Sequence, residues 1–225
     1  MLGEAIACRV RWRSHISDPL ASPRLALPDG FRRTFGPVLV VATRYYASPV
    51  GPFMTLVIAE PTRLAGRSGH TATLVVTDTL AAQVGMRLNW GVPAELASLS
   101  WFDRDGVLEF VWNDSGFSIT GEPRRVIVPI VSSMRGLQMR SDAPVLVPGS
   151  IRGIARLARV TIVTAEGDQL AAVSGKHRGI VMNGAKYVAQ PAMTPSGWMA
   201  TMPVSQGATG RALGFHDASQ RVPVD

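Results

Sequence analysis

The sequence predicts a mainly β fold of the α+β class, in which an antiparallel sheet forms a closed or nearly closed barrel. Its apolar runs are short and rich in β-branched residues, glycine and proline separate them, and a single segment shows helical spacing. With 46% hydrophobic and 17% charged residues, the 225-residue chain can build a sizeable core within one large domain.

The two ends of the chain differ from its middle. Residues 1–30 contain Pro19, Pro23 and Pro28, and we expect them to form an irregular N-terminal arm. Residues 31–195 carry the strand signals and form the predicted domain. Residues 196–225 lose this pattern and are expected to be a C-terminal tail.

The first half of the domain contains three predicted strands and the helix. Residues 38–46 and 53–59 predict two strands joined by a Ser-Pro and Gly-Pro turn, and residues 71–77 predict a central strand. Leu80, Val84 and Leu88 recur at helical spacing. They predict one short helix over 79–88, directly before a motif loop.

The second half predicts a meander. Asp103-Arg-Asp-Gly106 is a hairpin signal between strands 99–102 and 107–112. The remaining strands are expected at 117–120, 125–131, 144–147, 153–163 and within 177–188. Such regular short strands favour a barrel.

The basic charge of the chain raises the question of an anionic partner. The formal net charge is +7, and all but two of the basic residues are arginines. These arginines are dispersed, and they lack the interleaved aromatic residues of a single-strand binding platform. We therefore expect no nucleic-acid partner.

Other composition features narrow the function class further. The single cysteine, Cys8, excludes an intramolecular disulfide, and the four histidines lack the spacing of metal ligands. We expect no metal and no cofactor. No window approaches the ~18–20 apolar residues of a membrane span, so we expect no membrane partner and a cytoplasmic location.

Two blocks carry the functional signal. Residues 45–56 read Tyr-Tyr-Ala-Ser-Pro-Val-Gly-Pro-Phe-Met-Thr-Leu, and residues 84–97 read Val-Gly-Met-Arg-Leu-Asn-Trp-Gly-Val-Pro-Ala-Glu-Leu-Ala. Together they resemble the acetoacetate decarboxylase family, over roughly residues 35–190. The resemblance implies a β-barrel around a small apolar cavity, a small-molecule oxo-compound as ligand, and a homo-oligomer.

The chain departs from this family at its defining residue. The second block of the family commonly reads Gly-Arg-Glu-Leu-Trp-Gly-(Ile/Phe)-Pro-Lys-(Glu/Lys)-Leu-Ala, and its lysine forms a Schiff base that takes up the electrons of the breaking bond. Ala94 stands at this position, and Thr55 stands where the family often has a glutamate. The resemblance therefore implies a divergent member for which ordinary Schiff-base decarboxylation is not expected.

Arg87 and Glu95 are the candidate catalytic residues. Arg87 could hold an anionic oxygen of the substrate, or it could be a helix C-terminal arginine that answers the helix dipole or pairs with Glu95. Glu95, beside Ala94, is a candidate general base or one half of an ion pair. The sequence leaves both pairs of alternatives open.

The remaining candidates are substrate-binding positions and a relocated amine. The expected substrate-binding residues are Tyr46, Ser48, Phe53, Thr55, Trp90 and Ala94. Lys176, beside His177 and Arg178, is a candidate for a relocated amine, with Lys186 as the second lysine. The alternative for this cation cluster is a solvated turn.

These observations support two hypotheses. The first is an enzyme, a lyase, cyclase or isomerase that binds a small or mid-sized oxo-compound and works without a lysine Schiff base. The second is a non-catalytic ligand-binding protein on the same fold.

Overall fold

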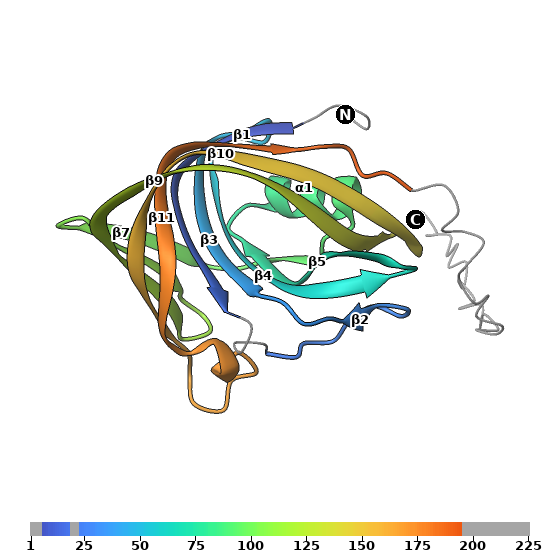
Figure 1. Cartoon of the computed structure of the whole chain (residues 1–225), viewed down its shortest axis with the longest axis horizontal. Coiled ribbons are helices and arrows are strands. Elements are labelled where there is room, and N and C mark those ends of the chain that lie inside the picture. Colours follow the sequence, from blue (N-terminus) through green and yellow to red (C-terminus); the bar gives the residue numbers. More distant parts are fainter. Residues whose placement is uncertain (1–5, 19–22, 195–225) are drawn as a thin grey trace, which may run out of the picture.

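The computed structural model describes residues 6–18 and 23–194, and most of them belong to one large sheet (Figure 1). The sheet is accompanied by helix α1 (Leu80–Trp90) and a short 3-10 helix, Ala171–Val173. The strands are β1 Ile6–Asp18, β2 Arg32–Arg33, β3 Val38–Ala47, β4 Phe53–Leu64, β5 Arg67–Thr77, β6 Ala94–Leu96, β7 Leu99–Arg104, β8 Val107–Trp112, β9 Phe117–Arg140, β10 Ala143–Val163 and β11 Gly175–Ala189.

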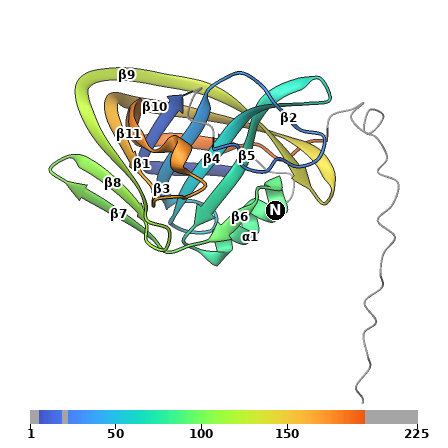
Figure 2. The ribbon, with the colours of Figure 1, turned by 90° about the horizontal axis from the view of Figure 1, so that it is seen from below.

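The sheet is strongly curved, but it does not close into a barrel. Its strand order is β6-β5-β4-β3-β1-β11-β10-β9-β8-β7, antiparallel except for the β5–β6 pair. A single bridge, His70 to Gly136, joins β5 to β9. The 24-residue β9 pairs with β8 at its start and reaches β5 only near its end, so the β7–β8 hairpin stands apart from that bridge (Figure 2). The expected mainly β fold with one helix is confirmed, and the closed barrel is wrong.

The N-terminal segment also differs from the expected irregular arm. Residues 6–18 form β1, which pairs with β3 on one side and β11 on the other. The three prolines of this region lie outside the strand, at 19, 23 and 28, so each β1 residue keeps its backbone N–H for the ladder. The expected tail at 196–225 lies outside the described residues.

The two faces of β3 and β4 have different roles, because successive side chains of a strand point to opposite faces. One face carries Val40, Leu56 and Ile58, which are fully buried in the main core. Large side chains of the later strands complete that core, among them Phe110 and Phe117. The opposite face of β3 and β4 lines a cavity.

Helix α1 lies at one end of the curved sheet, beside β6 (Figure 2). The Thr79 hydroxyl caps its start by accepting a hydrogen bond from the Ala82 N–H. The predicted helix is present, yet Leu80, Val84 and Leu88, whose spacing predicted it, are 64%, 44% and 66% exposed. In the described part of the chain, no helix has the length and apolarity needed to cross a membrane.

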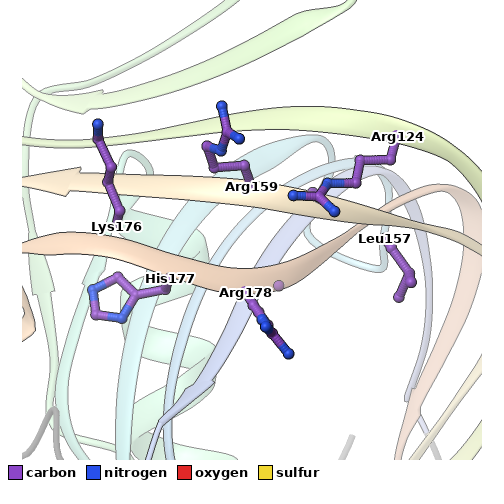
Figure 3. Close-up of a pocket in the computed structure, with 8 residues that line it drawn as sticks. Arg124, Leu157, Arg159, Lys176, His177 and Arg178 are labelled. Atoms are coloured by element: carbon purple, nitrogen blue, oxygen red, sulfur yellow. The ribbon is translucent and has the colours of Figure 1, made fainter.

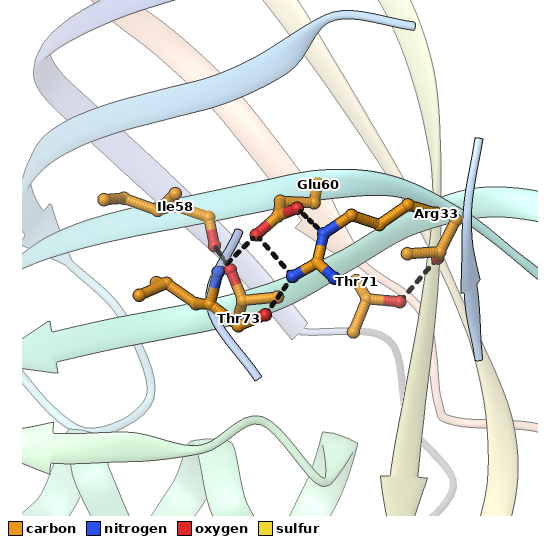
Figure 4. Close-up of polar contacts among 7 residues, drawn as sticks. Arg33, Ile58, Glu60, Thr71 and Thr73 are labelled. Carbon is orange, nitrogen blue, oxygen red and sulfur yellow. Dashed lines mark hydrogen bonds and ion pairs between the residues drawn. The ribbon is translucent and has the colours of Figure 1, made fainter. Parts of the chain in front are cut away.

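A buried carboxylate fastens residues 23–33 to the sheet (Figure 4). Glu60 of β4 is fully buried, and the Arg33 Nε donates to it at 2.5 Å. The Leu25 N–H also donates to Glu60, and the Arg33 guanidinium donates to the Leu25 carbonyl. Arg33 therefore links the two ends of the 23–33 segment to each other and to strand β4.

Candidate active site

The candidate site is a cavity of about 200 Å³ on the concave side of the sheet. The β3 and β4 side chains that face it alternate along each strand and stand opposite one another, as in the pairs Thr43–Thr55 and Tyr45–Phe53. Met86, Trp90 and Val92 border it from α1 and the following loop. The other lining residues come from β3, β4, β5, β9, β10 and β11: Leu39, Val41, Val57, Ala59, His70, Ala72, Val75, Met134, Arg135, Gly136, Gln138, Val147, Gly149 and Tyr187.

Three buried polar side chains interrupt this mostly apolar lining. Thr43, Thr55 and Gln138 are 2%, 1% and 4% exposed. Within residues 23–194, no side-chain hydrogen bond satisfies either hydroxyl or the amide of Gln138. Among the described residues, the fully buried side-chain polar atom without a partner is Trp101 Nε1. The polar atoms of Thr43, Thr55 and Gln138 are therefore open to the cavity, where they can meet polar atoms of a ligand.

One further residue supplies proton-transfer capacity. Arg135 of β9 borders the cavity as well, but it alternates with Met134, Gly136 and Gln138, so its exposed side chain points to the opposite face of the strand. His70 lies where β5 meets β9, and its Nε2 is 3.1 Å from the Pro37 carbonyl oxygen. Because a carbonyl only accepts, this contact places the proton on Nε2 and leaves Nδ1 of the neutral ring as an acceptor.

The loop after α1 is held by a set of hydrogen bonds. The Arg87 Nε and the Gln83 amide both donate to the Ala94 carbonyl, at 2.6 Å and 3.3 Å. The Trp90 indole N–H donates to the Gln190 carbonyl at 3.2 Å. The second sequence block is therefore fastened to β11's end as well as to its own helix.

Gly91 closes the helix against β9. Its φ of 66° is left-handed, and its N–H bonds to the Arg87 carbonyl, which is a common glycine cap. A Cβ at this position would lie 2.0 Å from the Met139 carbonyl oxygen. Glycine is thus required both by the turn and by the close approach of β9.

The structure places half of the expected substrate-binding residues at the cavity. Phe53, Thr55 and Trp90 line it. Tyr46 is 44% exposed and points away, because the alternation of β3 turns Tyr45 inward instead. The Ser48 hydroxyl is used within its turn, where it bonds to the Gly51 carbonyl at 2.6 Å.

Ala94 is fully buried but does not line the cavity. Its strand partner Val75 does, so the cavity wall lies immediately beside it. The resemblance placed residue 94 at the centre of the chemistry. In this chain, position 94 carries a buried methyl group that is not part of the cavity lining.

The candidate catalytic residues lie outside the cavity lining. Glu95 is exposed on β6, and the Arg87 Nε is engaged by the Ala94 carbonyl. Lys176 and Lys186, the two lysines of the chain, are exposed on β11, and neither lines the cavity. The geometry therefore gives none of the four a position from which to act on a ligand held there.

Sequence reasoning missed the polar residues of the cavity. Thr43, Tyr45, His70, Arg135 and Gln138 were not among the expected site residues. A weak signal existed for Thr43 and Tyr45, which continue the inward alternation of Leu39 and Val41. None existed for Gln138, since its role depends on where β9 bends toward β5. The described residues contain no group of three or more histidine, cysteine or acidic side chains that could hold a metal ion.

Comparisons with known proteins bear on the fold. No protein-family model matches the chain, and neither does any curated protein. Among solved structures, acetoacetate decarboxylase from Legionella pneumophila is similar, with a TM-score of 0.62 and 14% identity over 87% of this chain and 88% of that one. An acetoacetate decarboxylase-like enzyme from Sphingomonas wittichii RW1 gives 0.58 and 13% over 87% and 93%.

A third similar structure is the enduracididine biosynthesis enzyme MppR, complexed with pyruvate. Its TM-score is 0.53, with 14% identity over 84% of this chain and 88% of that one. At such identities the likeness shows the fold and leaves the reaction open. The chain has the acetoacetate decarboxylase-like fold, in agreement with the resemblance of its two sequence blocks.

Proposed function

We propose that the protein binds a small oxo-acid in the cavity and catalyses proton transfer on it without a lysine Schiff base, as a lyase, cyclase or isomerase. The observation that carries the proposal is the set of three polar side chains, Thr43, Thr55 and Gln138, that line the cavity and have no side-chain hydrogen bond among the described residues. The cavity of about 200 Å³ is smaller than the ~300–1,000 Å³ of typical drug-sized sites. Similar structures include one that holds pyruvate.

Each polar group matches one part of an oxo-acid. The Gln138 amide and the threonine hydroxyls can donate hydrogen bonds to the carbonyl and carboxylate oxygens. His70 Nδ1 can take a proton from the carbon next to the carbonyl. The C–H electron pair then forms the enolate and the proton gives an imidazolium, and return of the proton reverses the step.

The absence of a lysine from the cavity lining argues against the family's usual route. A Schiff base requires a neutral amine at the carbonyl carbon. The side-chain amines of the chain, Lys176 and Lys186, lie on the outer face of β11. An enolate held by hydrogen bonds needs no amine, so we favour enolate chemistry.

The alternative function is ligand binding without turnover. It is favoured by one observation: the described residues that line the cavity include no aspartate, glutamate or lysine. The side chains there that could exchange a proton are His70, Tyr45 and Tyr187, and both tyrosines already have interaction partners. The two functions are separated by whether a bound oxo-acid exchanges its α-protons.

The binding half of the proposal is tested by calorimetric titration with pyruvate and acetoacetate. Gln138→Met should weaken binding about tenfold, the equivalent of one neutral hydrogen bond. The same variant should be about as stable as the parent, because no described residue forms a side-chain hydrogen bond with the Gln138 amide. Equal affinity of parent and variant for both acids would refute the role of Gln138.

A threonine pair provides the matched control. Thr55→Val should weaken binding while leaving stability unchanged or higher. Thr71→Val should lower stability by about 1–3 kcal/mol, because the Thr71 hydroxyl bonds to Thr62 at 2.6 Å inside the protein. If Thr55→Val were as destabilising as Thr71→Val, the Thr55 hydroxyl would be structural.

The catalytic half is tested by α-proton exchange of bound pyruvate in deuterium oxide, followed by NMR. The parent should accelerate the exchange, His70→Gln should abolish the acceleration, and borohydride should trap no adduct. Tight binding without exchange would establish the binding alternative. A trapped adduct on a lysine would refute the Schiff-base-free mechanism.

A further inference from the structure

A second hollow lies on the outer face of the sheet, away from the cavity residues. It has a volume of about 500 Å³ and is bordered by β9, β10 and β11. Its lining includes Arg124, Arg159, Lys176, His177 and Arg178. Of the eight described residues that line it, five are basic and none is acidic.

The strand register places two of these cations at paired positions. Arg159 and Arg178 are direct partners across β10 and β11. The Figure 3 view shows Arg159 and Lys176 projecting in one direction, with the Arg124 guanidinium extending toward Arg159, while Arg178 turns the other way.

The described acidic residues compensate little of this charge. Glu122 approaches Arg159 at 3.7 Å, but the two side chains are 52% and 57% exposed, and such surface pairs contribute about 0–1 kcal/mol. Arg124, Lys176 and Arg178 form no ion pair within residues 23–194. His177 has a different role, since its Nε2 bonds to the Val173 carbonyl at 3.0 Å.

We propose that this hollow is a binding site for a small ligand that carries a di- or triphosphate group, held by Arg124, Arg159 and Lys176. Arginine forks bind phosphate oxygens in pairs, and lysine adds a point charge. Several cations around one hollow match a compact ligand with several negative charges. A nucleic acid is less suitable, because no aromatic side chain lines the hollow to stack on bases.

The site is tested by titrating the full chain with inorganic tripolyphosphate, pyrophosphate and monophosphate in moderate salt. We expect tripolyphosphate to bind at least tenfold more tightly than monophosphate. The triple variant Arg124→Ser, Arg159→Ser, Lys176→Ser should bind it at least tenfold more weakly than the parent. The control Arg63→Ser removes an exposed arginine of β4 that does not line the hollow, and it should bind as the parent does.

Several results would overturn the proposal. Failure of the parent to bind tripolyphosphate would do so without any variant. An equal loss in Arg63→Ser would show a general effect of net charge. Tighter binding of duplex DNA with a steep salt dependence would instead identify a nucleic-acid surface. The single variant Arg159→Ser, which loses only an exposed ion pair with Glu122, should bind more weakly while its melting temperature stays close to that of the parent.

Discussion

The loop that follows α1 offers a sharp test of the structure through two glycines of one segment. Gly91 caps the helix with a φ of 66°, and Gly85 lies within the helix. An added Cβ would lie 2.0 Å from the Met139 carbonyl oxygen at Gly91, whereas at Gly85 its nearest neighbour is the Asn89 amide at 4.0 Å. The same substitution should therefore have opposite effects at positions six residues apart.

The magnitudes follow from these two environments. Gly91→Ala places an L-residue in the left-handed region, at about 1–2 kcal/mol, and adds an overpacking cost of about 1–3 kcal/mol. Because the clash is with backbone, we expect a loss of roughly 2–5 kcal/mol. Gly85→Ala should stabilise by about 0.5–1 kcal/mol through helix propensity.

The assay is urea and thermal unfolding of the two variants beside the parent. For a chain of this size, 1 kcal/mol corresponds to about 2–4 °C in melting temperature. Gly91→Ala should melt roughly 4–20 °C lower, and Gly85→Ala about 1–4 °C higher. If Gly91→Ala lost less than about 1 kcal/mol, the close approach of β9 to the motif loop would be wrong.

Two further predictions concern contacts that hold the curved sheet together. Arg33→Met should lower the free energy of unfolding in urea by about 2–3 kcal/mol. This is somewhat below the ~3–5 kcal/mol for a fully buried pair, because the Arg33 side chain is 36% exposed. The control Arg32→Met, on the exposed neighbour, should change stability by no more than about 0.5 kcal/mol. An equal effect at both arginines would contradict the role of Glu60. Gly69→Ala would bring a Cβ to 2.5 Å from the Arg135 carbonyl oxygen. It should therefore lower stability by about 1–3 kcal/mol and weaken ligand binding in the cavity, and both effects can be measured on one sample. Unchanged binding would show that the β5–β9 junction does not shape the site.

The sequence was sufficient for several elements and insufficient for the lengths of the later strands and for closure. The strands predicted at 117–120 and 125–131 are parts of one strand, β9, and those at 144–147 and 153–163 are parts of β10. β-branched runs and turn residues identified β3, β4 and the β7–β8 hairpin, because these are local signals. The central position of β1 was not predicted, because the prolines at 19, 23 and 28 are typical of an irregular segment. Whether the sheet closes into a barrel depends on how much of β9 pairs with β5. The single bridge between these strands joins residues that are 66 positions apart in the sequence. No local pattern encodes such a pairing.

For helix α1, the spacing of apolar residues predicts the helix but not which of its faces is buried. The spacing of Leu80, Val84 and Leu88 identified a helix, since periodicity reports local conformation. It did not report which way the helix faces, and the structure leaves these three side chains exposed. The buried contacts of the helix come from Ala82 and from residues near its end, such as Trp90. The expected homo-oligomer stays a prediction. It can be tested by measuring whether a second copy of the chain covers the exposed face of α1.

The candidate site was the least predictable part, for a physical reason. The motif blocks predicted a site around Arg87, Ala94 and Glu95. In the structure, the Arg87 Nε donates to the Ala94 carbonyl, and Glu95 is not among the residues that line the cavity. The polar groups that do face the cavity are isolated threonines and a glutamine, which in a sequence look like ordinary strand residues. Their significance appears once the fold brings them together around one cavity, where their polar atoms face a space that a ligand can fill. A polar side chain that lines a mostly apolar cavity is therefore a better guide to this site than a motif position.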